Sequence, residues 1–304
     1  MSKCVGVEVD MLTNGSVFVH QRHYILDILK NNGMESCPPR DTPMGSKIRL
    51  TANQSPQNDS EQVQVVSRHQ SINYRQAVGQ LLFLLNTRPD LAYAVGEVSR
   101  FVANPGHEHF LALKRIFQYL KGTIDFGILY DKSQPPTLKA YSDSDWAGDP
   151  DTSKSTTGYV FTFMGEPITY RSSRQKSIAL SACDAETIAV SSAAQEAVWL
   201  RLVLEALGFA EVGPTTIYQD SQSSIAFAHN ETQHTKMKHL KLRDRYVRDL
   251  IEQKLVDTKY VPSAENLADI FTKPLPKPAF LNIRSKLNIV DGRSVQGENC
   301  TGNL

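Results

Sequence analysis

The stretch Leu138-Lys-Ala-Tyr-Ser-Asp143 decides the fold of the second half of the chain. Its residues favour a β-strand, and the run ends on a carboxylate, a group that is costly to bury without a partner. A second run, Thr215-Thr-Ile-Tyr-Gln-Asp220, ends in the same way. If the two strands are neighbours in one sheet, Asp143 and Asp220 lie side by side. The pattern therefore predicts a sheet with acidic groups gathered at one edge.

Two further acids lie near the starts of two helical patterns. Glu186 follows the start of a predicted helix over 183–207, and Asp269 lies in a predicted helix over 264–273. A cluster of carboxylates repels itself unless divalent cations are bound, and hard oxygen ligands suit Mg²⁺ or Mn²⁺ rather than zinc. Two such ions about 3.5–4 Å apart are suited to in-line attack on a phosphodiester. The four predicted metal ligands are Asp143, Glu186, Asp220 and Asp269.

Turn signals and hydrophobic periodicity predict how this sheet is built. Three strands in series are followed by alternating helices and strands, which indicates an α/β fold with a mixed five-stranded sheet and flanking helices. The predicted strands cover 138–143, 157–164, 167–172, 215–220 and 255–261. The predicted helices cover 183–207, 222–229, 240–253 and 264–273.

The first half of the chain predicts a β-hairpin and a small group of helices. The hairpin strands are expected over 5–9 and 16–20, with the turn signal Thr13-Asn-Gly between them. Apolar residues at three- and four-residue steps predict helices that can pack as a bundle. These helices cover 22–32, 73–86, 90–103 and 107–121, and a further strand is expected over 124–130.

These patterns divide the chain into five predicted segments. The α/β domain takes the larger part of the second half, and the segment rich in Gln, Ser and Asn is expected to be a linker. The segments are 1–50 with the hairpin, the linker 51–71, the helical segment 72–130, the α/β domain 131–280, and a tail over 281–304 that is expected to be disordered at its end.

Composition sets limits on the class of protein. A chain of 304 residues with 40% hydrophobic residues can hold two packed domains. The net charge of +1 excludes a global electrostatic attraction to nucleic acid. The four cysteines form no close pair, which favours a reducing compartment over a disulfide framework or a zinc ribbon. No apolar run is long enough for a membrane span and the N-terminus lacks a signal-peptide layout, so we expect a protein that is not secreted.

Several neighbouring groups compete with the four acids. Asp145 and Asp149 lie close to Asp143, while Asp184 lies two residues before Glu186 and could simply stabilise the helix dipole. Asp220 could be a helix N-cap, and Asp269 could be a solvated helix residue. A zinc site is an alternative for three histidines, His229, His234 and His239. Their five-residue steps drift around a helix, and no cysteine lies nearby.

Four motifs, in one order over about 140 residues, resemble the RNase H domain of copia-type LTR retrotransposon Pol polyproteins. They begin at Tyr141-Ser-Asp-Ser-Asp-Trp, Leu180-Ser-Ala-Cys-Asp-Ala-Glu, Gln219-Asp-Ser-Gln and Glu265-Asn-Leu-Ala-Asp-Ile-Phe-Thr-Lys-Pro-Leu. The resemblance implies that Asp143, Glu186, Asp220 and Asp269 are catalytic acids. Upstream, Tyr74-Arg-Gln-Ala-Val-Gly and Thr87-Arg-Pro-Asp-Leu-Ala-Tyr resemble the segment that joins the reverse transcriptase to RNase H. The hairpin resembles the end of the polymerase palm.

The resemblance implies an RNase H-like fold and a function. The expected activity is Mg²⁺- or Mn²⁺-dependent endonucleolytic cleavage of the RNA strand of an RNA–DNA hybrid, with two ions per site. The expected partners are that hybrid and the upstream reverse transcriptase and integrase portions of the polyprotein, without a membrane. The expected location is cytoplasmic, in a virus-like particle, and also nuclear.

Three departures from the family pattern narrow this expectation. No Tyr-x-Asp-Asp turn occurs in the chain, so DNA synthesis is not expected. The stretch Tyr260-Val-Pro-Ser-Ala-Glu-Asn lacks the histidine that cellular RNases H carry shortly before the last acid, and Lys241 stands where an acid is common. The alternative is a catalytically inactive nucleic-acid-binding relic of a retrotransposon.

Overall fold

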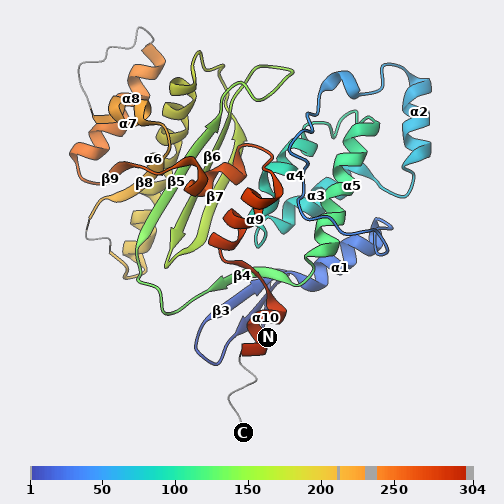
Figure 1. Cartoon of the computed structure of the whole chain (residues 1–304), viewed down its shortest axis with the longest axis horizontal. Coiled ribbons are helices and arrows are strands. Elements are labelled where there is room, and N and C mark those ends of the chain that lie inside the picture. Colours follow the sequence, from blue (N-terminus) through green and yellow to red (C-terminus); the bar gives the residue numbers. More distant parts are fainter. Residues whose placement is uncertain (1, 211–212, 230–237, 299–304) are drawn as a thin grey trace. The chain divides into compact units, whose positions relative to one another are not determined.

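The computed structural model describes residues 2–210, 213–229 and 238–298 and divides into two compact units (Figure 1). Unit 1 comprises Met1–Lys132 and Pro274–Leu304, and unit 2 comprises Ser133–Lys273. The chain therefore leaves unit 1 after Lys132 and returns to it at Pro274. The boundary of the α/β domain lies close to the predicted 131–280, but its last predicted residues belong to unit 1.

Unit 2 contains the predicted mixed five-stranded sheet, with the strand order β7-β6-β5-β8-β9. β6 pairs antiparallel with β5 and β7, whereas β8 pairs parallel with β5 and β9. Tyr141 on β5 lies beside Tyr218 on β8 in this register. The strands are β5 (Leu138–Asp145), β6 (Thr156–Phe163), β7 (Glu166–Arg174), β8 (Thr215–Gln219) and β9 (Val256–Tyr260).

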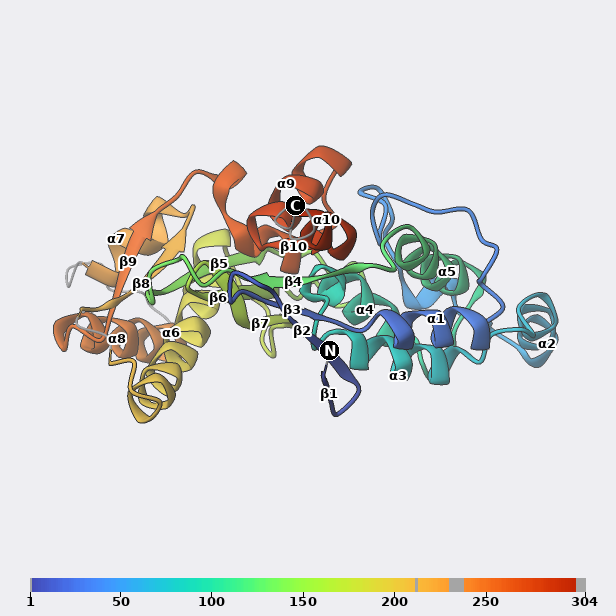
Figure 2. The same cartoon turned by 90° about the horizontal axis from the view of Figure 1, so that it is seen from below.

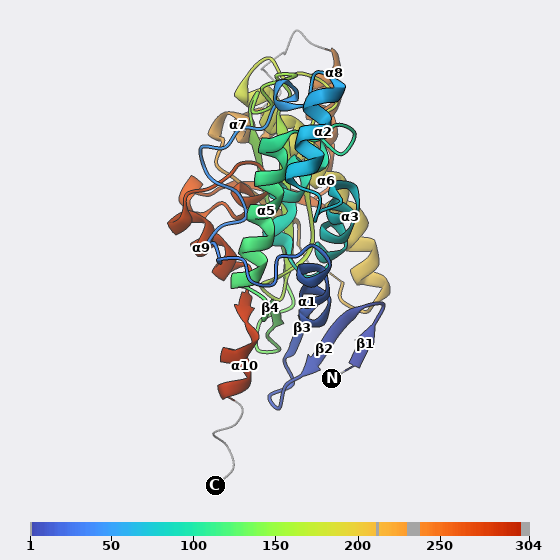
Figure 3. The ribbon, with the colours of Figure 1, turned by 90° about the vertical axis from the view of Figure 1, so that its right-hand side faces the viewer.

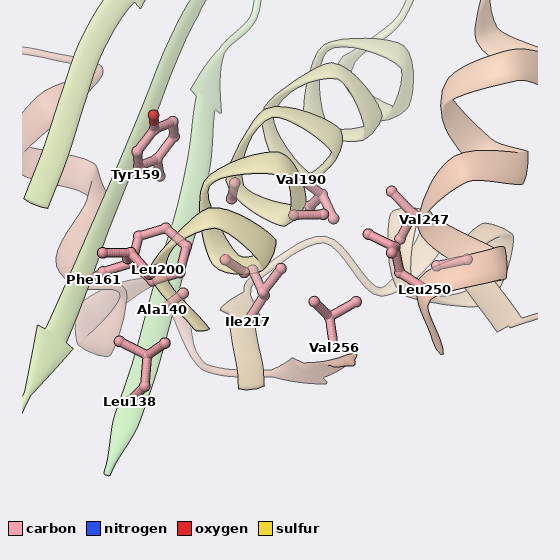
Figure 4. Packing of buried hydrophobic residues seen from close by; sticks show 14 of the residues in the cluster. Leu138, Ala140, Tyr159, Phe161, Val190, Leu200, Ile217, Val247, Leu250 and Val256 are labelled. Atoms are coloured by element: carbon pink, nitrogen blue, oxygen red, sulfur yellow. The ribbon is translucent and has the colours of Figure 1, made fainter. Parts of the chain in front are cut away.

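Helices α6 (Ala182–Ala206) and α8 (Lys238–Glu252) contribute to one apolar core with this sheet (Figures 2 and 4). Leu138 and Ala140 from β5 and Ile217 from β8 meet α6 there, as Figure 4 shows, and Val247 of α8 completes the core. Fully burying one such aliphatic side chain contributes roughly 1.5–3 kcal/mol. α7 (Gln222–His229) follows β8 directly.

A row of alanines sets the distance between α6 and its surroundings. They recur every fourth residue, so they share one helix face, and none is exposed to solvent. Because alanine is small, the helix backbone can approach its neighbours closely along this face. This close packing includes the N-terminal turns of α6, where Glu186 lies. The alanines are Ala185, Ala189, Ala193 and Ala197.

The predicted helix over 264–273 is wrong in type. Its place is taken by two 3₁₀ turns, η3 (Ser263–Glu265) and η4 (Leu267–Phe271). Asn266 between them caps η4 by accepting a hydrogen bond from the Ala268 amide, which starts a new turn. Pro274 then disfavours helical geometry at the residue before it. The local hydrogen bonding and the proline thus break a segment that has helical periodicity.

η4 packs against β6 at Gly158, which lies opposite Asp143 in the strand register. A side chain at Gly158 would collide with Phe271 and Thr272. The absence of a side chain there lets η4 approach the sheet and places Asp269 and Thr272 beside the end of β5.

Unit 1 contains a second five-stranded sheet, antiparallel throughout, in the order β1-β2-β3-β4-β10. Figure 3 shows β1, β2 and β3 as neighbours. The predicted hairpin is confirmed as β2 and β3, and β10 pairs with β4 although all of unit 2 separates them in the sequence. The strands are β1 (Ser2–Cys4), β2 (Val7–Met11), β3 (Val17–His20), β4 (Phe126–Tyr130) and β10 (Ile289–Asp291).

The predicted helices of unit 1 are present with small shifts at their ends. The segment over 90–103 begins with a 3₁₀ turn, η2 (Pro89–Leu91), as expected where a proline opens a helix. The helices are α1 (Arg22–Asn31), α3 (Tyr74–Leu84), α4 (Ala92–Ser99) and α5 (His107–Gly122).

Two segments of unit 1 are more ordered than predicted. The linker over 51–71 forms η1 (Ala52–Gln54) and α2 (Asp59–Arg68), whose N-cap Asn58 accepts from the Glu61 amide. The tail over 281–304 contains most of α9 (Lys277–Lys286), then β10 and α10 (Gly292–Glu298). α2 buries none of its residues, so hydrophobic periodicity could not indicate it. Among the described residues, no helix combines the length and the apolar character that a bilayer crossing requires.

Candidate metal centre and active site

Three of the four predicted acids converge in unit 2. Asp143, Glu186 and Asp220 each offer a carboxylate oxygen, and these oxygens all lie within 4.8 Å of one another. Asp143 lies near the end of β5 and Asp220 follows β8 directly. Because these strands are parallel neighbours, their carboxyl ends meet at the same edge of the sheet. Glu186 reaches this edge from the first turns of α6.

Asp143 is the most buried of the three, with 2% of its surface exposed. The Thr272 hydroxyl donates a hydrogen bond to its Oδ2. The Lys273 ammonium lies 3.6 Å from the same oxygen. Both contacts come from the residues that follow η4, so this turn fixes the orientation of the Asp143 carboxylate.

Glu186 carries a carboxylate with one partnered and one unpartnered oxygen. The Ser144 amide donates to Oε1 at 3.2 Å, while buried Oε2 has no hydrogen-bond partner among the described residues. Burial, followed by the charges of Asp143 and Asp220, raises the pKa of Glu186 to about 9. The folded site therefore favours the protonated form of Glu186, and a bound cation would compete with that proton.

Asp220 is half-buried and accepts a hydrogen bond from the Ser263 hydroxyl at 2.5 Å. The capping alternative for Asp220 meets a competitor, since the Ser221 hydroxyl accepts from the Ser224 amide at 3.3 Å in the first turn of α7. Ser221 therefore caps the start of α7, and the Asp220 carboxylate lies with the other acids of the cluster.

Asp269 is buried on η4 but lies outside the group of three. Lys273 Nζ is 2.9 Å from its Oδ1. Burial, followed by the charge of Asp143, raises the pKa of Asp269 to about 7, although Lys273 acts in the opposite direction. Asp269 therefore lies beside the cluster and is linked to Asp143 by Lys273. Because it is buried, it is not the solvated helix residue of the alternative interpretation.

The rival acids have contacts of their own. Asp149 accepts from Arg174 Nη1 at 2.6 Å and from the Thr152 hydroxyl, which ties the loop between β5 and β6 to β7. The Asp184 amide donates to the Ser181 hydroxyl at 3.1 Å in the first turn of α6. The Asp149 carboxylate thus has structural partners, and Asp184 lies in the first turn of α6. Neither belongs to the group in which the Asp143 and Glu186 carboxylates converge.

The histidine alternative is only partly described. His229 Nε2 lies 3.0 Å from the Thr258 hydroxyl, so this ring nitrogen has a hydrogen-bond partner within the protein. His234 lies outside the described residues, as do the side chains of His239 and Lys241.

Sequence reasoning missed three side chains that contact the acids. Thr272 and Lys273 belong to the motif that follows Asp269, and their presence there was the available signal. Ser263 lies in the stretch that lacks the expected histidine. Threonine, lysine and serine do not indicate a metal centre by themselves. The motif therefore marked two of these positions, but only the fold shows which acids they contact.

The donor set fits a hard divalent cation. The three converging groups are carboxylates, the ligands that Mg²⁺ and Mn²⁺ prefer. Two of them are more than nine-tenths buried, and the Glu186 Oε2 atom lacks a partner among the described residues. A cation held between them would satisfy that oxygen and offset the mutual repulsion of the carboxylates.

Comparisons with known proteins found relatives among transposon proteins. No family model matches the chain. The Retrovirus-related Pol polyprotein from transposon TNT 1-94 of Nicotiana tabacum is 36% identical over 269 residues, which are 88% of this chain and 20% of that protein. The corresponding protein from transposon RE1 of Arabidopsis thaliana is 35% identical over 285 residues, 94% of this chain and 19% of that protein. The chain belongs to the retrovirus-related Pol polyproteins of copia-type transposons.

The chain spans about a fifth of the length of these Pol polyproteins. A shorter relative, the Secreted RxLR effector protein 161 of Plasmopara viticola, is 44% identical over 131 residues, 43% of this chain and 92% of that protein. Unit 2 has the α/β fold class with a mixed five-stranded sheet that the sequence predicted.

Two solved structures are similar to parts of the chain. LC11-RNase H1, isolated from compost, is 17% identical with a TM-score of 0.36, and the match covers 45% of this chain and 94% of that one. The foamy viral protease-reverse transcriptase is 14% identical with a TM-score of 0.44, and the match covers 83% of this chain and 38% of that one.

Proposed function

We propose that unit 2 is the ribonuclease H of this Pol polyprotein and hydrolyses the RNA strand of an RNA–DNA hybrid endonucleolytically. The observation that carries this proposal is the convergence of the Asp143, Glu186 and Asp220 carboxylates at one edge of the sheet. The family and the fold class support the assignment, and the catalytic roles of the four acids, Asp269 included, are part of the proposal.

The chemistry assigned to the site depends on divalent cations, for which we propose two Mg²⁺ or Mn²⁺ ions per site. When bound, they activate water and stabilise charge on the leaving 3′ oxygen, which gives 5′-phosphate and 3′-hydroxyl ends. Asp143, Glu186 and Asp220 supply the ligand oxygens. Thr272 and Ser263 hold the carboxylates of Asp143 and Asp220 in place through their hydroxyls.

The substrate and partners follow from the same proposal. The RNA–DNA hybrid is the macromolecular substrate, and the upstream reverse transcriptase and integrase portions of the polyprotein are the partners. The proposed location is the cytoplasmic virus-like particle, with access to the nucleus. DNA synthesis is not assigned to this chain because its sequence contains no Tyr-x-Asp-Asp turn.

A cleavage assay with paired variants tests the proposal. The full chain is incubated with an end-labelled RNA–DNA hybrid and Mg²⁺, beside Asp143→Asn and Glu186→Gln. Each substitution should lower the cleavage rate at least about a hundredfold, because it removes a charged ligand oxygen from the transition-state site. The matched controls are the neighbouring acids, as Asp145→Asn and Asp184→Asn. They should keep cleavage within about threefold, because neither belongs to the group of converging carboxylates.

Each outcome of this assay has a meaning. Absence of cleavage by the unsubstituted chain, with EDTA-insensitive binding of the hybrid, would contradict the enzyme proposal and favour the nucleic-acid-binding alternative. Equal cleavage by the unsubstituted chain and Asp143→Asn would contradict the site assignment. Circular dichroism of each variant separates loss of a ligand from loss of folding.

A further inference from the structure

Lys273 places an ammonium inside the acid cluster. Its Nζ lies 2.9 Å from Asp269 Oδ1 and 3.6 Å from Asp143 Oδ2, so it bridges the two carboxylates. About a third of the Lys273 side chain is exposed, and the rest is enclosed by the site. The sequence motifs gave this residue no role, and the proposed cleavage chemistry does not use it.

The position of Lys273 is fixed by the residues before it. Thr272 is fully buried, its hydroxyl donates to Asp143, and its methyl group occupies the space left by Gly158. The Lys273 amide also donates to the Asp269 carbonyl at 3.4 Å. These contacts hold the backbone at residues 272 and 273, so withdrawal of the ammonium needs no more than a rotation of the Lys273 side chain.

The ammonium divides the acid cluster into two halves. On one side, the oxygens of Asp143, Glu186 and Asp220 converge within 4.8 Å of one another. On the other side, Asp143 and Asp269 share Lys273. Asp143 is common to both halves. A cation is thus already present on the Asp143–Asp269 side, where it offsets the repulsion between these two carboxylates.

We propose that Lys273 is a built-in cation that holds the Asp143–Asp269 side of the site, so that the protein without nucleic acid takes up one divalent ion rather than two. That ion is held by Asp143, Glu186 and Asp220. A second divalent ion requires Lys273 to withdraw from Asp269. Lys273 is therefore a positioning residue that controls how many ions the acids bind. This inference shares the metal site with the proposed function but does not depend on RNA cleavage.

Counting bound ions tests the inference without any substrate. The full chain is titrated with Mn²⁺, and the bound ions are counted by calorimetry and by electron paramagnetic resonance of free Mn²⁺. We expect one ion per chain. Lys273→Met keeps the apolar stem and removes the charge, so this variant should bind two ions. Adding Asp269→Asn to it should return the count to one.

The control and the contradicting outcomes are defined in the same experiment. Lys259→Met, on the exposed face of β9, should leave the count at one, because this ammonium lies 3.8 Å from Asp257 and is not among the contacts of the acid cluster. Two ions on the unsubstituted chain, none on it, or one on Lys273→Met would each overturn the inference. Lys273→Gln serves as a second variant if Lys273→Met does not fold, as judged by circular dichroism. Cleavage of a hybrid is measured separately, so the two proposals can fail independently.

Discussion

Arg88 is fully buried in unit 1. The contacts of its guanidinium give the Thr87-Arg-Pro-Asp motif a structural explanation. The guanidinium donates to both carboxylate oxygens of Asp90, at 3.0 and 2.8 Å, and to the carbonyl and hydroxyl of Thr123 at 3.0 and 2.9 Å. The Tyr119 hydroxyl donates to Asp90 at 2.6 Å. Burial opposes the charge of Asp90, but the contact with Arg88 holds its pKa below the ordinary range. The Thr87-Arg-Pro-Asp motif therefore has a folding role.

Removing this guanidinium should destabilise unit 1 strongly. Arg88→Met leaves the Asp90 carboxylate buried without its charged partner, which costs about 3–5 kcal/mol in free energy of unfolding. Arg88→Lys should lie between, because an ammonium cannot donate to both oxygens in the same fork geometry. Urea unfolding measures the change, and exposed Arg75→Met on α3 is the control. A loss no larger than that of the control would contradict the folding role.

Glu8 gives a second, pH-dependent prediction. It is buried on β2 and caps α1, since its Oε1 accepts from the His23 amide at 2.9 Å and its Oε2 lies 2.6 Å from His23 Nδ1. Burial raises its pKa, but the hydrogen bonds with His23 outweigh burial and hold the pKa below its ordinary 4.5. A carboxyl with a lowered pKa adds stability above its ordinary pKa, and this stability is lost as pH falls through the lowered value.

Glu8→Gln should therefore lower the free energy of unfolding by about 1–2 kcal/mol at pH 7, and the difference should shrink below pH 4.5. Unfolding with urea over a pH series measures it. Asp27→Asn, on the exposed side of α1, is the control and should change the free energy of unfolding little. A constant difference for Glu8→Gln across the series would mean that its charge does not matter.

That Asp143, Glu186 and Asp220 meet could be predicted, because strand ends and motif order carry information about these acids. The catalytic roles of the four acids stay a prediction. The contacts of their neighbours could not be predicted. Lys273 and Ser263 contact acids that are 130 and 43 positions earlier in the chain, and no local pattern encodes such a contact. The position of Asp269, to one side of the three converging acids, is likewise a property of where η4 lies on the sheet.

Among the elements, those with strong periodicity were predictable and those held by distant partners were not. The long helix α6 and the parallel neighbours β5 and β8 follow from apolar spacing. β10 is only three residues long and exists because β4 pairs with it. Its apolar neighbours on α9, Phe280 and Ile283, are buried as well. A segment that looks like a tail is thus part of a sheet.

The C-terminal segment should therefore stabilise unit 1. Leu287 ends α9 and is fully buried, so Leu287→Ala should cost about 2–4 kcal/mol, while exposed Lys286→Ala should cost little. Both tryptophans, Trp146 and Trp199, lie in unit 2, so far-ultraviolet circular dichroism should shift more than tryptophan fluorescence. Equal effects of the two substitutions would show that the segment is not part of the packed unit.

At the scale of the whole molecule, unit 2 is inserted into unit 1 and is attached to it by two covalent connections. A protease site placed between Ser133 and Gln134 breaks one of them. After cleavage, the fragment that carries β10 should stay bound to the fragment that carries β4, because their pairing and the burial around α9 are intact. Size-exclusion chromatography should give one peak in buffer and two in urea. Two peaks in buffer would contradict this account of unit 1.

The pairing of β4 with β10 also sets an order of events during synthesis on the ribosome. Tyr130 ends β4, and Ile289 begins β10 about 160 residues later. At about 5–20 residues per second, β4 waits roughly 10–30 s for its partner strand. All of Ser133–Lys273 emerges in that interval. The unit that begins translation first is thus the last to complete its sheet, and a nascent chain that stalls before Ile289 would expose the edge of β4 to other strands.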